Sequence, residues 1–194
     1  DGTEINLTLG AAINAMADRA YNAADHLLSL ANNSATDTYT VKLRVTVDNA
    51  AAAAGSDAFI WSNFSLCDTA RPDCPNELLF SALESDTVFG DMVNGNAAAT
   101  AGGALSDSLN QLLTFVLNPG DVQNLWGSVV LEGQIFAQAD DSAINASLRS
   151  SITLESIEVR SGNGGGGTVP EPAAAFLVAL GLGLLGWQRR SARI

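Results

Sequence analysis

Basic residues are scarce in this chain of 194 residues. Nine Lys plus Arg face 21 Asp plus Glu, which gives a formal net charge of −12 and an isoelectric point near 4.2. Binding to nucleic acid without regard to sequence requires Lys and Arg to displace the counterions of the phosphates. The charge balance therefore excludes this class of function, and we expect no nucleic-acid partner.

Histidine is limited to a single residue, His26, which directly follows Asp25. A Ser-His-Asp or Cys-His catalytic group would have to use His26, because both groups need an imidazole as the base. No G-x-S-x-G sequence is present, and a lone histidine is more often a solvated or capping residue. We therefore expect that the protein is not an enzyme and needs no cofactor.

Potential metal ligands and carboxylate pairs give little indication of chemistry. Two cysteines and a distant histidine do not make a zinc site, and no metal site is predicted. Calcium held by Asp140, Asp141 and nearby carbonyl groups stays an alternative, although no D-x-[DN]-x-[DN]-G loop occurs. Asp140 with Asp141, or Glu155 with Glu158, could hydrolyse a glycoside. Among 21 acidic residues such pairs arise by chance, and they more often serve as surface charges.

Aromatic residues make up 6% of the sequence. Phe59 and Trp61 are two residues apart within a strand-like run at 58–66, so they share one face of that strand. A flat aromatic pair could stack on sugar rings, as in carbohydrate-binding modules, and Trp126 is a third candidate. The alternative is packing in the core, which is the more common environment of aromatic side chains.

A long apolar run, AAAFLVALGLGLLGW, occupies residues 173–187. It is shorter than the roughly 20 residues that span a bilayer, but Gln188 and the arginines that follow can extend it to the interface. The run is apolar on all sides, whereas a buried helix of a soluble fold normally keeps a polar stripe. It therefore predicts a single transmembrane helix at 173–188.

Arg189, Arg190 and Arg193 belong to a basic tail at 189–194, beyond the last acidic residue. Positive residues that flank a span remain in the cytoplasm, so the acidic body is expected on the far side of the membrane. Export requires an N-terminal signal, yet the chain opens at Asp1. We expect that a signal peptide has been removed or that the sequence is a fragment.

The tetrapeptide Val-Pro-Glu-Pro at residues 169–172 stands directly before the apolar run. This tetrapeptide, a short transmembrane helix and an Arg-Arg pair together resemble the PEP-CTERM sorting signal of Gram-negative bacteria, over about 25 of 194 residues. The resemblance implies that an exosortase, an integral-membrane cysteine transpeptidase, recognises Pro170, Glu171 and Pro172. The enzyme would cut near these residues and release or transfer the body.

The resemblance also implies a location and partners. Proteins with this signal are typically surface or matrix components of bacteria that make exopolysaccharide, and many are associated with biofilm. The implied route passes through the inner membrane, with the body in the periplasm, and ends at the cell surface or in the extracellular matrix. The expected partners are the exosortase, the inner membrane before processing and exopolysaccharide.

Cys67 and Cys74 are the two cysteines of the chain. In an exported protein an even number of cysteines indicates a disulfide. Closing a loop of about eight residues stabilises a fold by roughly 2–3 kcal/mol in the chain-entropy model. We predict that Cys67 and Cys74 form a local cross-link at the end of a strand.

Alternation of apolar and polar residues predicts strands in the body. It is clearest from Thr38 to Asp48, where one face must lie in a core and the other in solvent. A strong turn signal, Asn-Pro-Gly-Asp, stands at 118–121. Further strand-like runs lie at 58–66, 112–117, 123–139 and 147–160. Many short strands at this spacing predict an all-β fold, an antiparallel and jelly-roll-like β-sandwich.

Some segments are less regular. Residues 11–31 fit both helical and period-two spacing, so helix and strand both stay open, and the surrounding strands favour strand. Gly127 and Gly133 are expected to mark a bulge or bend. A change of phase within 147–160 predicts either a bulge near Glu155 or two short strands. Loops are expected in the Ala-rich segments 50–54 and 97–104.

The sequence thus divides into three predicted units: an exported β-sandwich domain at 1–160, a Gly-rich linker at 161–168 and a sorting signal at 169–194. A flexible linker would let a membrane enzyme reach the cleavage segment without unfolding the domain. The predicted function is that of a non-enzymatic, exported surface or matrix protein. The alternative is a carbohydrate-binding module that is sorted by the same tail.

Overall fold

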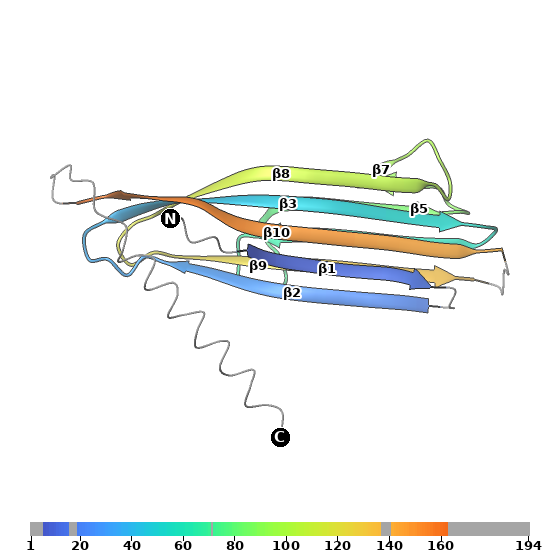
Figure 1. Ribbon diagram of the computed structural model, residues 1–194, viewed down its shortest axis with the longest axis horizontal. Coiled ribbons are helices and arrows are strands. Elements are labelled where there is room, and N and C mark those ends of the chain that lie inside the picture. The colour runs from blue at the N-terminus through green and yellow to red at the C-terminus, as the bar shows by residue number, and fades with distance from the viewer. Residues whose placement is uncertain (1–5, 16–18, 71, 137–140, 163–194) are drawn as a thin grey trace, which may run out of the picture.

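The computed structural model describes residues 6–15, 19–70, 72–136 and 141–162. Within these residues every paired strand is antiparallel, which confirms the predicted all-β fold. Residues 11–15 and 19–31 belong to two strands and not to a helix. The strands (Figure 1) are β1 (Asn6–Ala15), β2 (Arg19–Ala31), β3 (Thr38–Ala54), β4 (Ala58–Cys67), β5 (Glu77–Asp86), β6 (Met92–Val93), β7 (Asn96–Ala97), β8 (Ala104–Leu117), β9 (Val122–Ile135) and β10 (Ala143–Arg160).

The strands form two sheets, and Figure 1 shows their long strands running side by side along the molecule. One sheet has the order β1-β10-β3-β8 and the other the order β2-β9-β4-β5-β6-β7. The pairing is nested: β1 pairs with β10, β2 with β9, β3 with β8, and β4 with β5. This nested order is that of a jelly roll, whose eight long strands divide between two sheets.

The hydrophobic core lies between the two sheets. Every second side chain of β3 points inward, and Val45 and Val47 are almost completely buried. Ile60 and Phe64 of β4 enter the same core from the other sheet. The alternation that is visible in the sequence of β3 therefore corresponds to one core face and one solvent face.

The Ala-rich segment 50–54 is not a loop, contrary to the prediction. It continues β3, and its residues pair with β10 and, up to Ala52, with β8. Ala51 and Ala53 are buried between the sheets. Pairing to neighbouring strands and contact with the core outweigh the low strand propensity of alanine. The second predicted loop, 97–104, is correct apart from its ends, because Ala97 lies in β7 and Ala104 begins β8.

Gly133 is a packing residue, and neither it nor Gly127 marks a bulge as predicted. β9 pairs with β2 and β4 without a register shift at either glycine. A Cβ atom on Gly133 would lie 2.6 Å from the Cδ1 atoms of both Ile60 and Ile144. Glycine is required here because side chains from both sheets approach its backbone.

The bulge predicted near Glu155 is confirmed. In β10 the pairing with β3 shifts between Leu154 and Ser156. The extra residue lets β10 keep apolar side chains on the inner face while the sequence changes phase. Two other strands differ in their ends from the predicted runs, since β8 begins at Ala104 and β9 ends at Ile135.

A buried polar network joins the two sheets. Asn49 of β3 donates from Nδ2 to Ser81 Oγ of β5 at 3.1 Å and accepts a hydrogen bond from Ser62 Oγ of β4. Ser81 Oγ in turn donates to Asp107 Oδ2 of β8 at 2.8 Å. Because buried polar groups are costly when unsatisfied, this network favours one alignment of the sheets over others.

The sorting signal at 169–194, the transmembrane helix predicted at 173–188 and the linker from residue 163 onward lie outside the described residues. In the described part of the chain, no helix has the length and apolar character needed to cross a membrane.

Candidate functional site

Phe59 and Trp61 lie on the outer face of the six-stranded sheet. Both are half-buried, whereas Ile60 and Phe64 on the other face of β4 are buried in the core. The strand alternation predicted from the sequence is therefore correct. Neither aromatic ring belongs to the core cluster between the sheets.

Three further aromatic residues share this outer face. Trp126 of β9 pairs with Leu27 of β2, Phe80 of β5 pairs with Ser65 of β4, and Tyr21 of β2 pairs with Glu132 of β9. The exposed fractions of Tyr21 and Phe80 are 63% and 37%. We name the five residues the aromatic face: Tyr21, Phe59, Trp61, Phe80 and Trp126.

Carboxylates flank Trp61 on both sides. In the strand register Trp61 stands opposite Glu132 of β9 and Glu84 of β5. Glu132 accepts a hydrogen bond from Arg19 Nη2 at 2.7 Å. Partial burial raises the pKa of Glu84, and the nearby Asp86 carboxylate raises it further. Rings that can stack on sugar C–H groups thus lie beside acceptors for sugar hydroxyl groups.

The sequence indicates Phe59 and Trp61 but not Tyr21 or Phe80. Tyr21 fits the period-two pattern in the ambiguous segment 11–31, and that pattern is the signal that points to its face. Phe80 follows two leucines in β5, so local alternation does not reveal which face it occupies. Only the pairing of β5 with β4, in which Phe80 stands opposite Ser65, places Phe80 on the same face as the other rings.

His26 is not the solvated residue that the sequence predicts. Its side chain is half-buried and, with Phe64 and Leu125, lines a very small internal space between the sheets. Asp25 is exposed and, as the preceding strand residue, points to the opposite face. The structure therefore does not bring His26 and Asp25 together as a catalytic pair.

The predicted carboxylate pairs also lie apart from the aromatic face. Glu155 pairs with Arg44, and Glu158 Oε1 lies 2.5 Å from Lys42 Nζ, both on the four-stranded sheet. Asp141 accepts a hydrogen bond from Ser56 Oγ at 3.1 Å, and Asp140 lies outside the described residues. Among the described residues, no group of three or more His, Cys, Asp or Glu side chains is placed to hold a metal ion.

A groove of about 460 Å³ opens at the four-stranded sheet and contains two other carboxylates, Asp48 and Asp107. Asp107 Oδ2 accepts hydrogen bonds from Ser81 Oγ at 2.8 Å and from Asn94 Nδ2 at 3.1 Å. These bonds assign Asp107 to the network between the sheets. None of the predicted catalytic candidates that the structure describes lines this groove.

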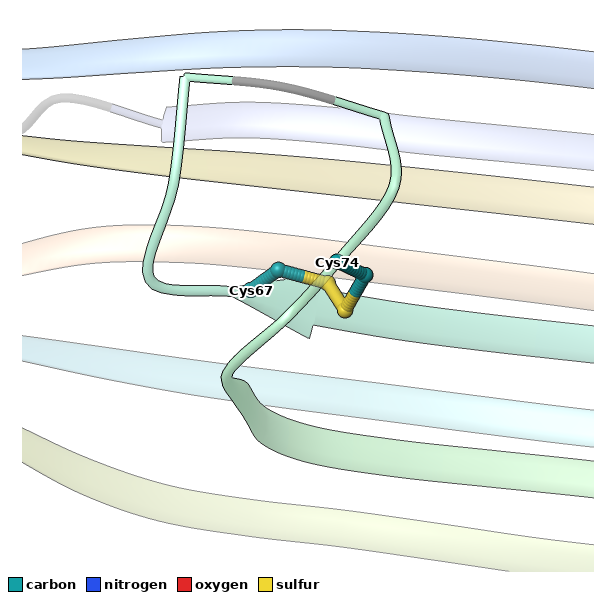
Figure 2. Close-up of a disulfide and its surroundings, with 2 residues drawn as sticks. All are labelled: Cys67 and Cys74. Carbon is teal, nitrogen blue, oxygen red and sulfur yellow. A yellow bond between two sulfur atoms is a disulfide. The ribbon is translucent and has the colours of Figure 1, made fainter.

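The predicted disulfide is present. Cys67 and Cys74 are bonded, with their Cα atoms 5.3 Å apart, and Figure 2 shows Cys74 lying beside the end of β4. The backbone N–H of Asp68 donates to Asn76 O at 2.8 Å. Gln123 Nε2 of β9 donates to Asp68 Oδ1. The cross-link therefore holds a short loop at one end of the six-stranded sheet.

These features define the class of protein: a jelly-roll sandwich with an aromatic outer face. The family model of the PEP-CTERM protein-sorting motif matches residues 168–193. The chain therefore carries this C-terminal motif and is a PEP-CTERM protein and an exosortase substrate. The motif implies that the protein is exported, anchored in a membrane before processing, and processed by an exosortase.

The matched residues include the predicted recognition residues Pro170, Glu171 and Pro172 and the arginines Arg189, Arg190 and Arg193. All six lie outside the described residues. Their individual roles in recognition and in membrane orientation stay predictions.

Two solved structures show weak similarity to the chain. A chain in the structure of infectious bursal disease virus Gx strain is 9% identical, with a TM-score of 0.24 over 94% of this chain and 50% of that chain. A chain in the structure of the Gt strain is 11% identical, with a TM-score of 0.20 over 91% of this chain and 47% of that chain. The present chain thus spans about half the length of these chains. TM-scores this low indicate neither a shared fold nor a shared function. No curated protein matches the chain.

Proposed function

We propose that this is a non-enzymatic surface or extracellular-matrix protein of a Gram-negative bacterium that makes exopolysaccharide. The sorting motif at 168–193 carries the proposal. It is supported by the body, where Glu155 and Glu158 form surface ion pairs and Asp141 accepts a hydrogen bond from Ser56. The body is a scaffold that is sent to the biofilm or cell surface.

The proposed route follows from charge and hydropathy. Residues 173–188 hold the protein in the inner membrane, with Arg189, Arg190 and Arg193 in the cytoplasm and the acidic body in the periplasm. Two prolines keep Glu171 in an extended segment that a protease-like site can bind. Cleavage near Pro170–Pro172 then separates the body from its membrane helix.

Replacing Pro170, Glu171 and Pro172 by alanine tests this route. In a host with the exosortase, the variant should remain at full length in the inner membrane, while the unmodified chain is shortened and leaves it. Ser161→Ala combined with Asn163→Ala in the adjoining linker is the matched control and should be processed normally. Normal processing of the triple variant would contradict the role proposed for these residues.

A second candidate function is polysaccharide binding by the aromatic face. The observation that favours it is the position of Phe59 and Trp61 outside the core, together with three further rings on the same sheet. Glu84 and Glu132 stand opposite Trp61, and like charges would repel an acidic polymer. We propose a neutral exopolysaccharide as the ligand.

Affinity electrophoresis in gels that contain neutral or acidic polysaccharide tests the second candidate. Trp61→Ala should weaken retardation in the neutral gel by about tenfold, because the loss of one stacked ring removes 1–2 kcal/mol by order of magnitude. Phe89→Ala is the control, since Phe89 is 89% exposed but lies in the turn after β5. Equal retardation of the Trp61 variant and the unmodified protein would exclude the aromatic face as the binding site.

A further inference from the structure

Strand β8 has an open hydrogen-bonding edge. It is the last strand of its sheet and pairs on one side with β3, from Tyr39↔Leu117 to Ala52↔Ala104. In an antiparallel ladder every second residue directs its N–H and C=O groups away from the partner strand. Among the described residues, one hydrogen bond reaches the β8 backbone from outside this ladder: Asn32 Nδ2 donates to Leu117 O at 2.9 Å. The other outward groups are therefore available for pairing with a further strand.

From residue 108 onward the edge lacks the usual protection against such pairing. Natural proteins blunt exposed edges with lysine, proline, bulges or very short strands. Residues 108–118, SLNQLLTFVLN, contain no charge, proline or glycine, and β8 pairs with β3 without a register shift. At the other side of the sandwich β1 and β2, the edge strands of the two sheets, lie side by side (Figure 1), so each covers its neighbour.

The side chains of β8 suit pairing with an identical strand. Leu112 and Val116 are 44% and 59% exposed and, with Thr114 between them, point to the same outer face. An antiparallel pair centred on Thr114 places Leu112 of each copy opposite Val116 of the other. Apolar cross-strand pairs of this kind stabilise sheets.

The charge of the chain also favours a second copy of the protein as the partner of β8. The chain has a net charge of −12, so two copies repel each other over most of their surfaces. An uncharged edge is where they can approach with the least repulsion. We propose that β8 pairs antiparallel with β8 of a second copy, which joins two four-stranded sheets into one sheet of eight strands about a two-fold axis.

Sedimentation equilibrium of the full chain in a density-matched detergent tests this proposal. The unmodified chain should form a dimer at concentrations up to about 100 μM. The dimer should tighten as salt is added, because salt screens the repulsion between acidic bodies. Leu112→Lys combined with Val116→Lys should raise the dimer dissociation constant by about tenfold or more.

Val122→Lys is the matched control, since Val122 is 58% exposed but lies in β9, an inner strand of the other sheet. It should leave the dimer unchanged. If the double variant does not fold, as judged by circular dichroism, Thr114→Lys on the same edge provides the test. A monomeric unmodified chain, equal weakening by Val122→Lys, or growth into open-ended fibres would each overturn the proposal.

Discussion

The outer faces of the two sheets differ in chemistry although both cover the same core. The six-stranded sheet carries the aromatic face, with Glu84 and Glu132 beside Trp61. The outer positions of β3 and β10 carry small polar side chains and surface cations, including Lys42 and Arg44 with their acidic partners. Since burial in the core does not require rings on an outer face, the aromatic face is not explained by packing between the sheets.

The largest expected difference is in stability, when one aromatic ring on each face of β4 is replaced by alanine. Phe64→Ala should lower the free energy of unfolding by about 3–5 kcal/mol, because Phe64 is buried between the sheets. Trp61→Ala should cost only about 1–2 kcal/mol, because its ring is half-buried on the outer face. Urea unfolding of both variants gives the two values. An equal loss would make Trp61 a structural residue and remove the distinction between the faces.

The disulfide tests whether the aromatic face depends on the loop at its end. Cys67→Ala combined with Cys74→Ala should cost about 2–3 kcal/mol of stability. Cys67 stands opposite Trp126 in the register, so binding that requires Trp126 should weaken, whereas binding through Trp61 should persist. Thermal unfolding and affinity electrophoresis measure the two effects. The reduced unmodified protein is the control and should match the double variant.

Removing the central residue of the buried polar network measures how much that network contributes to holding the two sheets together. Asn49→Ala leaves Ser62 and Ser81 without their shared partner and should cost about 1–3 kcal/mol. Asn110→Ala, at an exposed outer position of β8, is the matched control and should change stability much less. Denaturant unfolding distinguishes them. Equal effects would show that the buried amide has no special part in holding the sheets together.

The smallest expected effect is a change in Tm when one acidic residue on the outer face of each sheet is neutralised. The pKa of Glu84 is raised in the folded protein, so stability falls as the pH rises through that pKa and Glu84 ionises. Glu84→Gln should therefore raise Tm slightly at about pH 7 and leave it unchanged at about pH 3, where the carboxyl is protonated in both states. Glu158→Gln, at an exposed residue paired with Lys42, should give no such gain. A gain that persists in acid would contradict burial as its cause.

Sequence reasoning succeeds where local alternation decides the structure. The alternating residues of β3, the faces of β4 and the bulge in β10 all follow from the period of their side chains. It fails where neighbouring strands decide. Ala50–Ala54 lack strand propensity but are held by β8 and β10, and Gly133 is fixed by side chains that approach it from both sheets.

The candidate site shows the same limit. Phe59 and Trp61 can be assigned to one face because they lie on one strand. Glu84, Glu132 and Tyr21 come from three other strands, and their alignment with Trp61 across the sheet depends on strand order and register. A single sequence does not specify these. The sorting motif is the opposite case, because its three parts are contiguous and can be recognised without a structure.

The most direct measurement is the intact mass of the protein recovered from cells that produce it. The surface or matrix fraction should contain a chain that ends near Pro170–Pro172 and lacks the apolar stretch that follows. Recovery from the cytosol of a chain that still includes residues 173–194 would contradict export and processing, and with them the proposed function.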